Sequence, residues 1–121
     1  MSVQLSGVVI DCGSPATLAD FWQQVLGWPG RDDGERGEVI LEPAAGTPAA
    51  AADQSLVFQP VAEPKTVKNR LHLDLWPDDQ AAVVSRLEAL GARRIDVGQG
   101  DDKSFVVLAD PEGNEFCVLS G

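Results

Sequence analysis

The chain has 121 residues, the length of one ordinary domain. Its composition, 44% hydrophobic and 23% charged, is that of a globular protein, and no apolar run approaches the roughly 20 residues needed to span a bilayer. Nine basic and nineteen acidic side chains give a net charge of −10, which repels phosphate backbones and anionic lipid surfaces. We therefore expect no nucleic-acid or membrane partner.

The first residues of the chain predict a cytoplasmic protein. Met1 to Gln4 has neither the basic start nor the apolar run of a signal peptide. Because the cytoplasm keeps thiols reduced, we expect Cys12 and Cys117 to be free of disulfides.

Two stretches of the sequence, Gly7 to Trp28 and His72 to Ala92, resemble two copies of one unit. Each predicts a strand, a polar turn, an amphipathic helix and a glycine that ends the helix. A repeat of this size predicts an α+β fold made of two β-α-β-β-β modules, at residues 1–62 and 69–121. The polar stretch Glu63 to Asn69 is the expected linker between them.

The helices are the clearest elements of the pattern. Ser14 is suited to cap the start of the first helix, and Asp78 or Asp79 that of the second. Gly27 and Gly91 follow the two helix ends. The apolar stripes that should face the sheets are Leu18, Phe21, Trp22, Val25 and Leu26 in the first helix and Val83, Val84, Leu87 and Leu90 in the second. Predicted strands are Leu5 to Asp11, a short one near Arg31, Glu38 to Glu42, Ser55 to Val61, Arg70 to Leu75, Arg93 to Val97, Ser104 to Ala109 and Glu115 to Leu119.

Three connections have distinct compositions. The Ala- and Pro-rich stretch Pro43 to Asp53 predicts a mobile loop, either a plain connection or a segment that overhangs the ligand site. Turns at Gly98 to Asp102 and at Asp110 to Asn114 should join consecutive strands as hairpins. In the second turn, Asp110 and Gly113 are explained by turn geometry and not by catalysis.

Strand periodicity places a polar row on the predicted fifth strand. Because alternate residues of a strand face opposite ways, His72, Asp74 and Trp76 share one face. The intervening leucines, Leu71, Leu73 and Leu75, should pack under the helix. The row therefore predicts a binding site on the face opposite the helix.

The last strand of each predicted module contributes to the same face. Glu115, Cys117 and Leu119 should look away from the helix, while Phe116 and Val118 pack beneath it. In the first module, Gln59 is the polar residue of the corresponding strand. Cys117 is open to two interpretations, a small buried hydrophobe or a reactive thiol.

The residues VVIDCGSPATLADFWQQVLGW, NRLHLDLWPDD, LEALGAR and above all VLADPEGNEFCVL resemble the glyoxalase-like branch of the vicinal oxygen chelate superfamily. That superfamily includes glyoxalase I, bleomycin-resistance proteins and extradiol dioxygenases. The resemblance covers almost the whole chain apart from the Ala-rich stretch. It implies paired modules that form an eight-stranded, incompletely closed barrel-like sheet around a cleft, commonly in a homodimer.

Metal-dependent members of the superfamily hold a divalent ion with a His or Gln on the first strand and a Glu on the fourth strand of each module. Transferred to this chain, the His positions fall on Gly7 and His72, and the Glu positions fall near Gln59 and on Cys117. Only His72 matches. The resemblance therefore implies no oxygen-rich metal site and no standard glyoxalase I activity, although zinc could accept His72 and Cys117.

Two classes of function remain open. The first is a metal-free, drug-sequestering binder that traps a cationic or aromatic small molecule, with Trp22 and Trp76 for stacking and Asp74 for charge. The second is a lyase or isomerase in which His72 and Asp74 transfer protons on a small oxygenated metabolite. His72 itself has three open roles: an acid–base or binding group, a structural hydrogen-bonding residue, or a metal ligand. The ligand-binding residues predicted for either class are Trp22, Gln59, His72, Asp74, Trp76 and Cys117.

Overall fold

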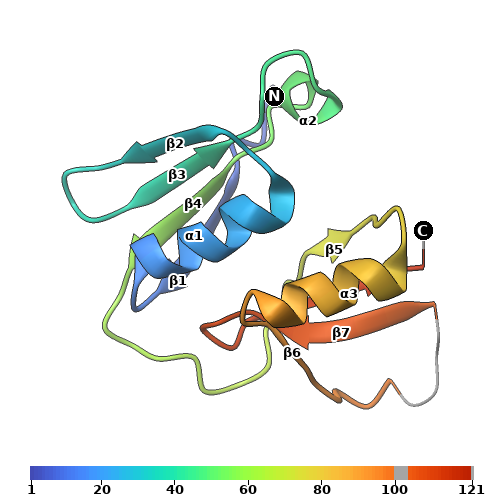
Figure 1. Cartoon of the computed structure of the whole chain (residues 1–121). Coiled ribbons are helices and arrows are strands. Elements are labelled where there is room, and N and C mark those ends of the chain that lie inside the picture. Colours follow the sequence, from blue (N-terminus) through green and yellow to red (C-terminus); the bar gives the residue numbers. More distant parts are fainter. Residues whose placement is uncertain (100–103, 121) are drawn as a thin grey trace. The chain divides into compact units, whose positions relative to one another are not determined.

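The computed structural model describes residues 1–99 and 104–120. The chain divides into two compact units, Met1–Pro64 and Lys65–Gly121. Each unit has its own four-stranded sheet and a helix of ten or more residues against it (Figure 1). The division falls inside the predicted linker, close to the predicted end of the first module.

Unit 1 places its first and fourth strands side by side. The strand order is β1-β4-β3-β2, with β1 parallel to β4 and the other neighbours antiparallel. Because β1 and β4 are parallel, the chain must cross over between them, and helix α1 lies on that connection. The elements are β1 (Val8–Cys12), α1 (Pro15–Leu26), β2 (Gly30–Asp33), β3 (Val39–Glu42), α2 (Pro48–Ala51) and β4 (Leu56–Pro60).

The core of unit 1 lies between α1 and its sheet. Leu18 and Trp22 of the predicted stripe are fully buried, as are Leu41 and Phe58 on the strands beneath. Gly27 ends the helix in the left-handed conformation, at a φ of 66°, which a residue without a side chain adopts at little cost.

The Ala-rich stretch is more ordered than the sequence predicts. Residues Pro48–Ala51 form the short helix α2, which we had expected to be loop. Thr47 caps it, accepting a hydrogen bond on its side-chain oxygen from the backbone N–H of Ala50 at 3.3 Å. Pro48 follows at the first helical position, where its fixed φ and missing N–H are tolerated. A Thr-Pro start followed by four alanines thus suffices for one turn of helix.

Unit 2 repeats the topology of unit 1. Its strand order is β5-β8-β7-β6, again with the first strand parallel to the last. As predicted, Asp79 caps α3, accepting from the N–H of Ala82 at 3.0 Å. Gly91, beyond the helix end, has a φ of 116°. The elements are β5 (Asp74–Leu75), α3 (Gln80–Ala89), β6 (Arg93–Arg94), β7 (Phe105–Ala109) and β8 (Glu115–Leu119).

The turn before β8 is held by Asp110, as the sequence predicts. This carboxylate is buried and accepts hydrogen bonds from the N–H groups of Glu112 and Asn114 at 3.0 and 2.9 Å. Gly113 lies between them with a φ of 89°. These hydrogen bonds and the left-handed glycine stabilise the hairpin turn. The turn Asp110 to Asn114, which carries the strongest family resemblance, therefore has a structural role in this chain.

Two strands of unit 2 are shorter than predicted. Strand β5 includes only Asp74 and Leu75, and Leu71, expected under the helix, is 88% exposed. The hydrogen bonding to β8 begins only at Leu73, whose carbonyl accepts from the N–H of Cys117 at 2.9 Å. Upstream of the predicted strand, the N–H of Asn69 donates to the Glu115 side chain and not to a strand. Strand β6 likewise ends at Arg94. The predicted turn at residues 98–102 lies partly outside the described residues.

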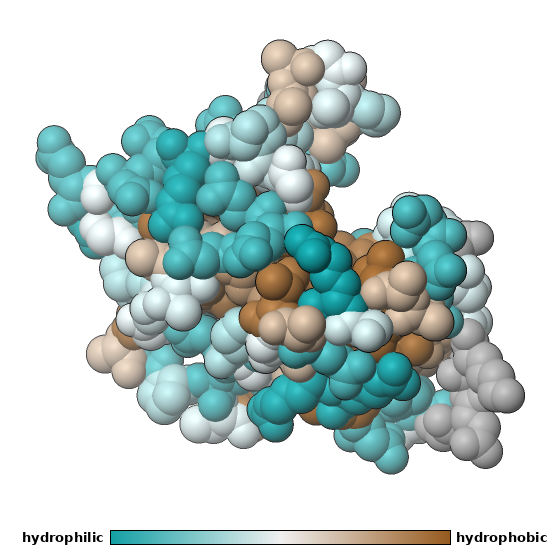
Figure 2. Space-filling model, in the orientation of Figure 1, coloured by the Kyte–Doolittle hydropathy of each residue, from teal (hydrophilic) through white to brown (hydrophobic). Residues whose placement is uncertain are grey.

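The fold is therefore α+β, with two β-α-β-β-β units. The eight strands pair as two separate four-stranded sheets, and the hydrogen bonding among the described residues closes no barrel. Hydrophilic residues dominate the face of the molecule shown in Figure 2. A search of the described residues finds no helix with the length and apolar character needed to cross a membrane.

Candidate functional site in unit 2

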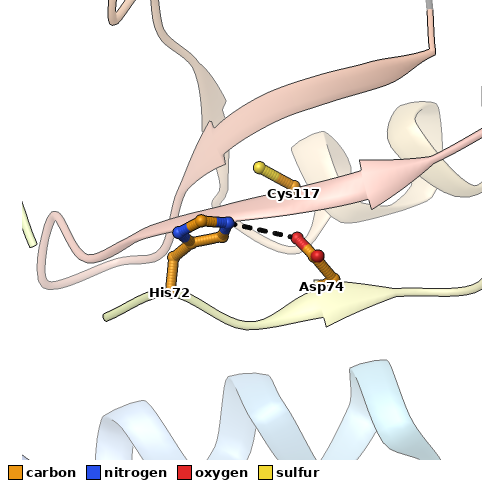
Figure 3. Close-up of side chains that lie close together, drawn as sticks. All are labelled: His72, Asp74 and Cys117. Carbon is orange, nitrogen blue, oxygen red and sulfur yellow. Dashed lines mark ion pairs between the residues drawn. The ribbon is translucent and has the colours of Figure 1, made fainter. Parts of the chain in front are cut away.

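His72, Asp74 and Cys117 come together on the face of the unit 2 sheet opposite α3. Strand β5 carries Asp74, His72 precedes it by two residues, and β8 supplies Cys117, whose Cα is paired with that of Asp74. Their ligand atoms all lie within 4.8 Å of one another (Figure 3). Within residues 1–99 and 104–120 no other three His, Cys, Asp or Glu side chains gather in this way. Asp74 and Cys117 are Cα partners in the sheet, in line with the predicted alternation, and His72 lies beside them although β5 begins only at Asp74.

The imidazole of His72 pairs with Asp74. Nε2 of His72 lies 3.3 Å from Oδ1 of Asp74, and the two side chains are 44% and 51% exposed. Neighbouring side chains on one face of a strand are usually about 7 Å apart at Cβ, so both must lean together to reach this distance. The pair presents a polar, titratable group to the surface of the sheet.

Cys117 is the buried member of the cluster. Burial raises the pKa of its thiol, and the carboxylate of Asp74 raises this pKa further through its charge and by accepting a hydrogen bond. Lys68 acts in the opposite direction through its charge. The thiol therefore stays protonated near neutral pH, which argues against an activated nucleophile.

The cluster lines a pocket of about 250 Å³ that is formed entirely within unit 2. The remaining wall is mostly apolar, with two charged groups, Lys68 and Glu115. Strand alternation predicts Glu115 and Leu119 on this face, whereas nothing in the local sequence pattern distinguishes the others as lining residues. The apolar lining residues are Val97, Phe105, Val107 and Leu119.

Glu115, which lines this pocket, binds two residues of the predicted linker. Its carboxylate is only 7% exposed. The oxygen Oε1 lies 2.8 Å from Nζ of Lys65 and accepts a hydrogen bond from the backbone N–H of Asn69 at 3.0 Å. Burial alone would raise the pKa of Glu115, but these hydrogen bonds together hold it below its ordinary value. The segment 65–69 is thus tied to β8 and is not a loose connection, and its Lys68 lines the pocket.

Three predicted ligand-binding residues lie outside the pocket. Trp22 is 1% exposed in the core of unit 1 and therefore offers no surface to a ligand. Its ring packs edge-on against that of Phe21, with the two ring centroids 5.3 Å apart. Trp76 is 77% exposed and does not line the pocket. Gln59 is an exposed residue of β4 in unit 1. Phe105 is the aromatic ring that does line the pocket.

The matching positions in unit 1 carry no comparable cluster. If His72 is aligned with Gly7, as in the sequence repeat, Asp74 aligns with Val9, whose Cα partner on β4 is Val57. Strand register therefore makes Val57, and not Gln59, the equivalent of Cys117. A side chain at Gly7 would also collide with the side chain of Ser55. Among the positions that the repeat aligns, only those of unit 2 carry the cluster of histidine, aspartate and cysteine side chains.

A larger hollow of about 600 Å³ lies in unit 1, beside the segment Gln4 to Ser6. Its lining includes two carboxylates, Glu42 and Asp53, but no histidine or cysteine. Since it brings together no set of convergent catalytic or metal-ligating groups, the pocket in unit 2 is the stronger candidate.

Comparison with known proteins places this fold in a family. Residues 7–119 match the glyoxalase-like domain, so the chain belongs to the glyoxalase-like domain family. No curated protein matches the chain in sequence.

Solved structures show the same fold at low sequence identity. A variant of the fosfomycin resistance protein FosX from Listeria monocytogenes, complexed with Mn(II) and dihydroxypropylphosphonic acid, is 13% identical with a TM-score of 0.71, covering 100% of this chain and 92% of its own. A glyoxalase/bleomycin resistance protein/dioxygenase family enzyme from Burkholderia phytofirmans PsJN is 21% identical with a TM-score of 0.68, covering 96% and 97%. UcmS2 is 19% identical with a TM-score of 0.68 and covers both chains fully.

Proposed function

We propose that this domain binds a small organic molecule in the unit 2 pocket, with the apolar or aromatic part of the ligand against the wall and a cationic group near Asp74. The observation that supports this most directly is the position of the His72–Asp74 pair beside a wall that includes Phe105 and Leu119. Binding pockets commonly combine such an apolar lining with a few convergent polar groups.

Pocket size and charge narrow the class of ligand. A volume of about 250 Å³ is below the roughly 300–1,000 Å³ typical of sites for drug-sized molecules, which favours a small ligand. The net charge of −10 attracts cations over longer range. Phe105 takes the stacking role that the sequence assigned to Trp22 and Trp76.

The Mn(II) ion of the Listeria FosX complex has no matching ligand set here. Manganese favours carboxylate, carbonyl and water oxygens, whereas the cluster offers one oxygen donor beside a nitrogen and a sulfur. The proposed binding of an organic cation therefore uses no manganese ion.

The His72–Asp74 pair favours a second candidate function, that of a lyase or isomerase. Asp74, at 3.3 Å, can hold the orientation of the imidazole while His72 takes a proton from a small oxygenated metabolite and returns it at another atom of the same molecule. Formation of a product separates this candidate from the binder. Both candidates depend on the same pair of residues.

The binding proposal is tested with chelator-treated, full-length protein and a panel of small aromatic cations, each paired with a neutral molecule of the same shape. A ligand that binds the folded state raises the midpoint of thermal unfolding by mass action. We expect the cations to raise it for the wild type but not for Asp74→Asn, while Asp78→Asn, at an exposed position outside the pocket, behaves as the wild type. Equal effects of cation and neutral analogue, or full retention in Asp74→Asn, would contradict the proposal.

We also propose that the protein acts in the cytoplasm as a homodimer, without nucleic acid or membrane partners. The charge balance supports the exclusion of anionic partners. Sedimentation equilibrium tests the dimer directly, since a mass of one chain over the micromolar range would contradict it.

A further inference from the structure

We propose that His72, Asp74 and Cys117 bind one thiophilic divalent metal ion, such as Zn²⁺, within unit 2. The inference goes beyond the organic ligand proposed above and does not depend on it. It follows from the donor atoms that the strand register brings together: an imidazole nitrogen, a carboxylate oxygen and a cysteine sulfur within 4.8 Å.

The geometry of the cluster is close to that of a three-ligand zinc site. Zinc lies about 2.0–2.3 Å from its ligand atoms, which puts tetrahedral ligands roughly 3.5 Å apart. His72 and Asp74 are already 3.3 Å apart at Nε2 and Oδ1. The Cys117 sulfur lies within 4.8 Å of both other donor atoms, so those two separations must shorten by at most about 1.3 Å. The two half-exposed side chains can rotate to do so while Cys117 stays fixed in the sheet.

The donor set determines which ion fits. Imidazole together with a thiolate favours zinc and its chemical relatives, whereas manganese and magnesium favour oxygen ligands. The carboxylate and the thiolate together would offset the two positive charges of the ion. Three protein ligands leave a fourth position open, as in sites where zinc holds an exchangeable molecule.

We expect one ion per chain, because the positions of unit 1 that align with the cluster lack donor side chains. These positions are Gly7, Val9 and Val57. Cys12, the other buried cysteine, lies in β1 of unit 1 and is not part of the cluster. It therefore provides a matched control for Cys117.

Cobalt replaces zinc for the test because Co²⁺ bonded to a thiolate has a charge-transfer absorption band in the near ultraviolet. Full-length, chelator-treated protein is titrated with Co²⁺, and then with Zn²⁺ or Mn²⁺ as competitors. We expect one Co²⁺ per chain with the thiolate band, displaced by Zn²⁺ but not by an equal concentration of Mn²⁺. The band should vanish in Cys117→Ser and persist in Cys12→Ser.

Two further variants keep the inference testable if Cys117→Ser does not fold. His72→Ala and Asp74→Asn change exposed side chains, so far-ultraviolet circular dichroism should match that of the wild type. Each should weaken Co²⁺ binding by more than the roughly 10- to 100-fold typical of losing an outer-shell partner. Absence of the thiolate band in the wild type, affinity unchanged in both variants, or preference for Mn²⁺ would overturn the inference.

The metal and the organic cation share Asp74, so each should exclude the other. Zn²⁺ should therefore weaken the binding of an aromatic cation to the wild type, and unimpaired binding of both at once would overturn the assignment of Asp74 as a ligand. The organic-ligand experiment uses chelator-treated protein without added metal. Failure to detect binding of an aromatic cation therefore does not affect the cobalt result, and failure to detect cobalt binding does not affect the organic-ligand result.

Discussion

Lys65 and Glu115 join the start of unit 2 to the first residue of β8: Nζ of Lys65 lies 2.8 Å from Oε1 and 3.1 Å from Oε2 of the carboxylate. The Lys65 side chain is 21% exposed and that of Glu115 is 7% exposed. A bidentate contact at this depth is screened less than a surface ion pair and holds the segment before His72 against the sheet.

Replacing Lys65 with Met should lower the free energy of unfolding of unit 2 by about 1–3 kcal/mol, because a nearly buried carboxylate loses a charged hydrogen-bond donor. Urea unfolding followed by circular dichroism measures the change. Lys68→Met is the matched control: its ammonium donates to the backbone oxygen of Asn69 at an exposed position, so about 0.5 kcal/mol or less is expected. Equal losses in the two variants would contradict a structural role for the Lys65–Glu115 contact.

The same contact predicts how stability depends on pH. Because the pKa of Glu115 in the folded protein is below its ordinary value of 4.5, the folded state favours the ionised carboxylate. Its contribution is fully present above that ordinary value and is lost as the pH falls through the lower pKa of the folded state. The stability difference between wild type and Glu115→Gln should therefore be larger near pH 7 than near pH 3. A difference independent of pH would contradict the assignment.

The thiol of Cys117 should react slowly with alkylating reagents in chelated protein. Burial, and then Asp74, raise its pKa, so little thiolate is present at neutral pH. In a Cys12→Ser background, Asp74→Asn should shift the pH profile of alkylation to lower pH, because the negative charge beside the thiol is removed. Mass spectrometry follows the reaction. An unchanged profile would show that Asp74 does not act on the thiol.

Two tryptophans should differ sharply in their contribution to stability. Trp22→Ala removes a fully buried ring from the core of unit 1 and should cost about 3–5 kcal/mol. Trp76→Ala removes a mostly exposed ring and should change stability by about 0.5 kcal/mol or less. Urea unfolding of each variant provides the comparison, and a large loss from Trp76→Ala would mean that this indole packs against the protein.

The repeated architecture was predictable because it depends on local patterns. Apolar stripes of period 3.6 located both helices, and alternation placed Phe116 and Val118 under α3 with Cys117 on the other face. The turn at Asp110 followed from side-chain capping within five residues. Such signals need no knowledge of distant contacts.

The sequence predictions that differ from the structure concern features that depend on contacts between residues far apart in the chain. The extent of β5 depends on its pairing with β8, and the segment before it is held by the bond from Asn69 to Glu115, which are 46 positions apart. Trp22 was assigned to a ligand on its chemistry alone, although the helical stripe already favoured the core. The role of Phe105 in the pocket wall and the equivalence of Val57 with Cys117 both required strand register, which the sequence does not specify.

The most direct test of the account is the magnetic resonance signal of His72, because this chain contains one histidine and its ring signals need no assignment. Chelated protein is titrated with the aromatic cation that most raises the unfolding midpoint. We expect ring signals that shift and saturate with the binding isotherm, and no shift in Asp74→Asn. Saturable binding that leaves the His72 ring signals unmoved would place the ligand elsewhere and contradict the central claim.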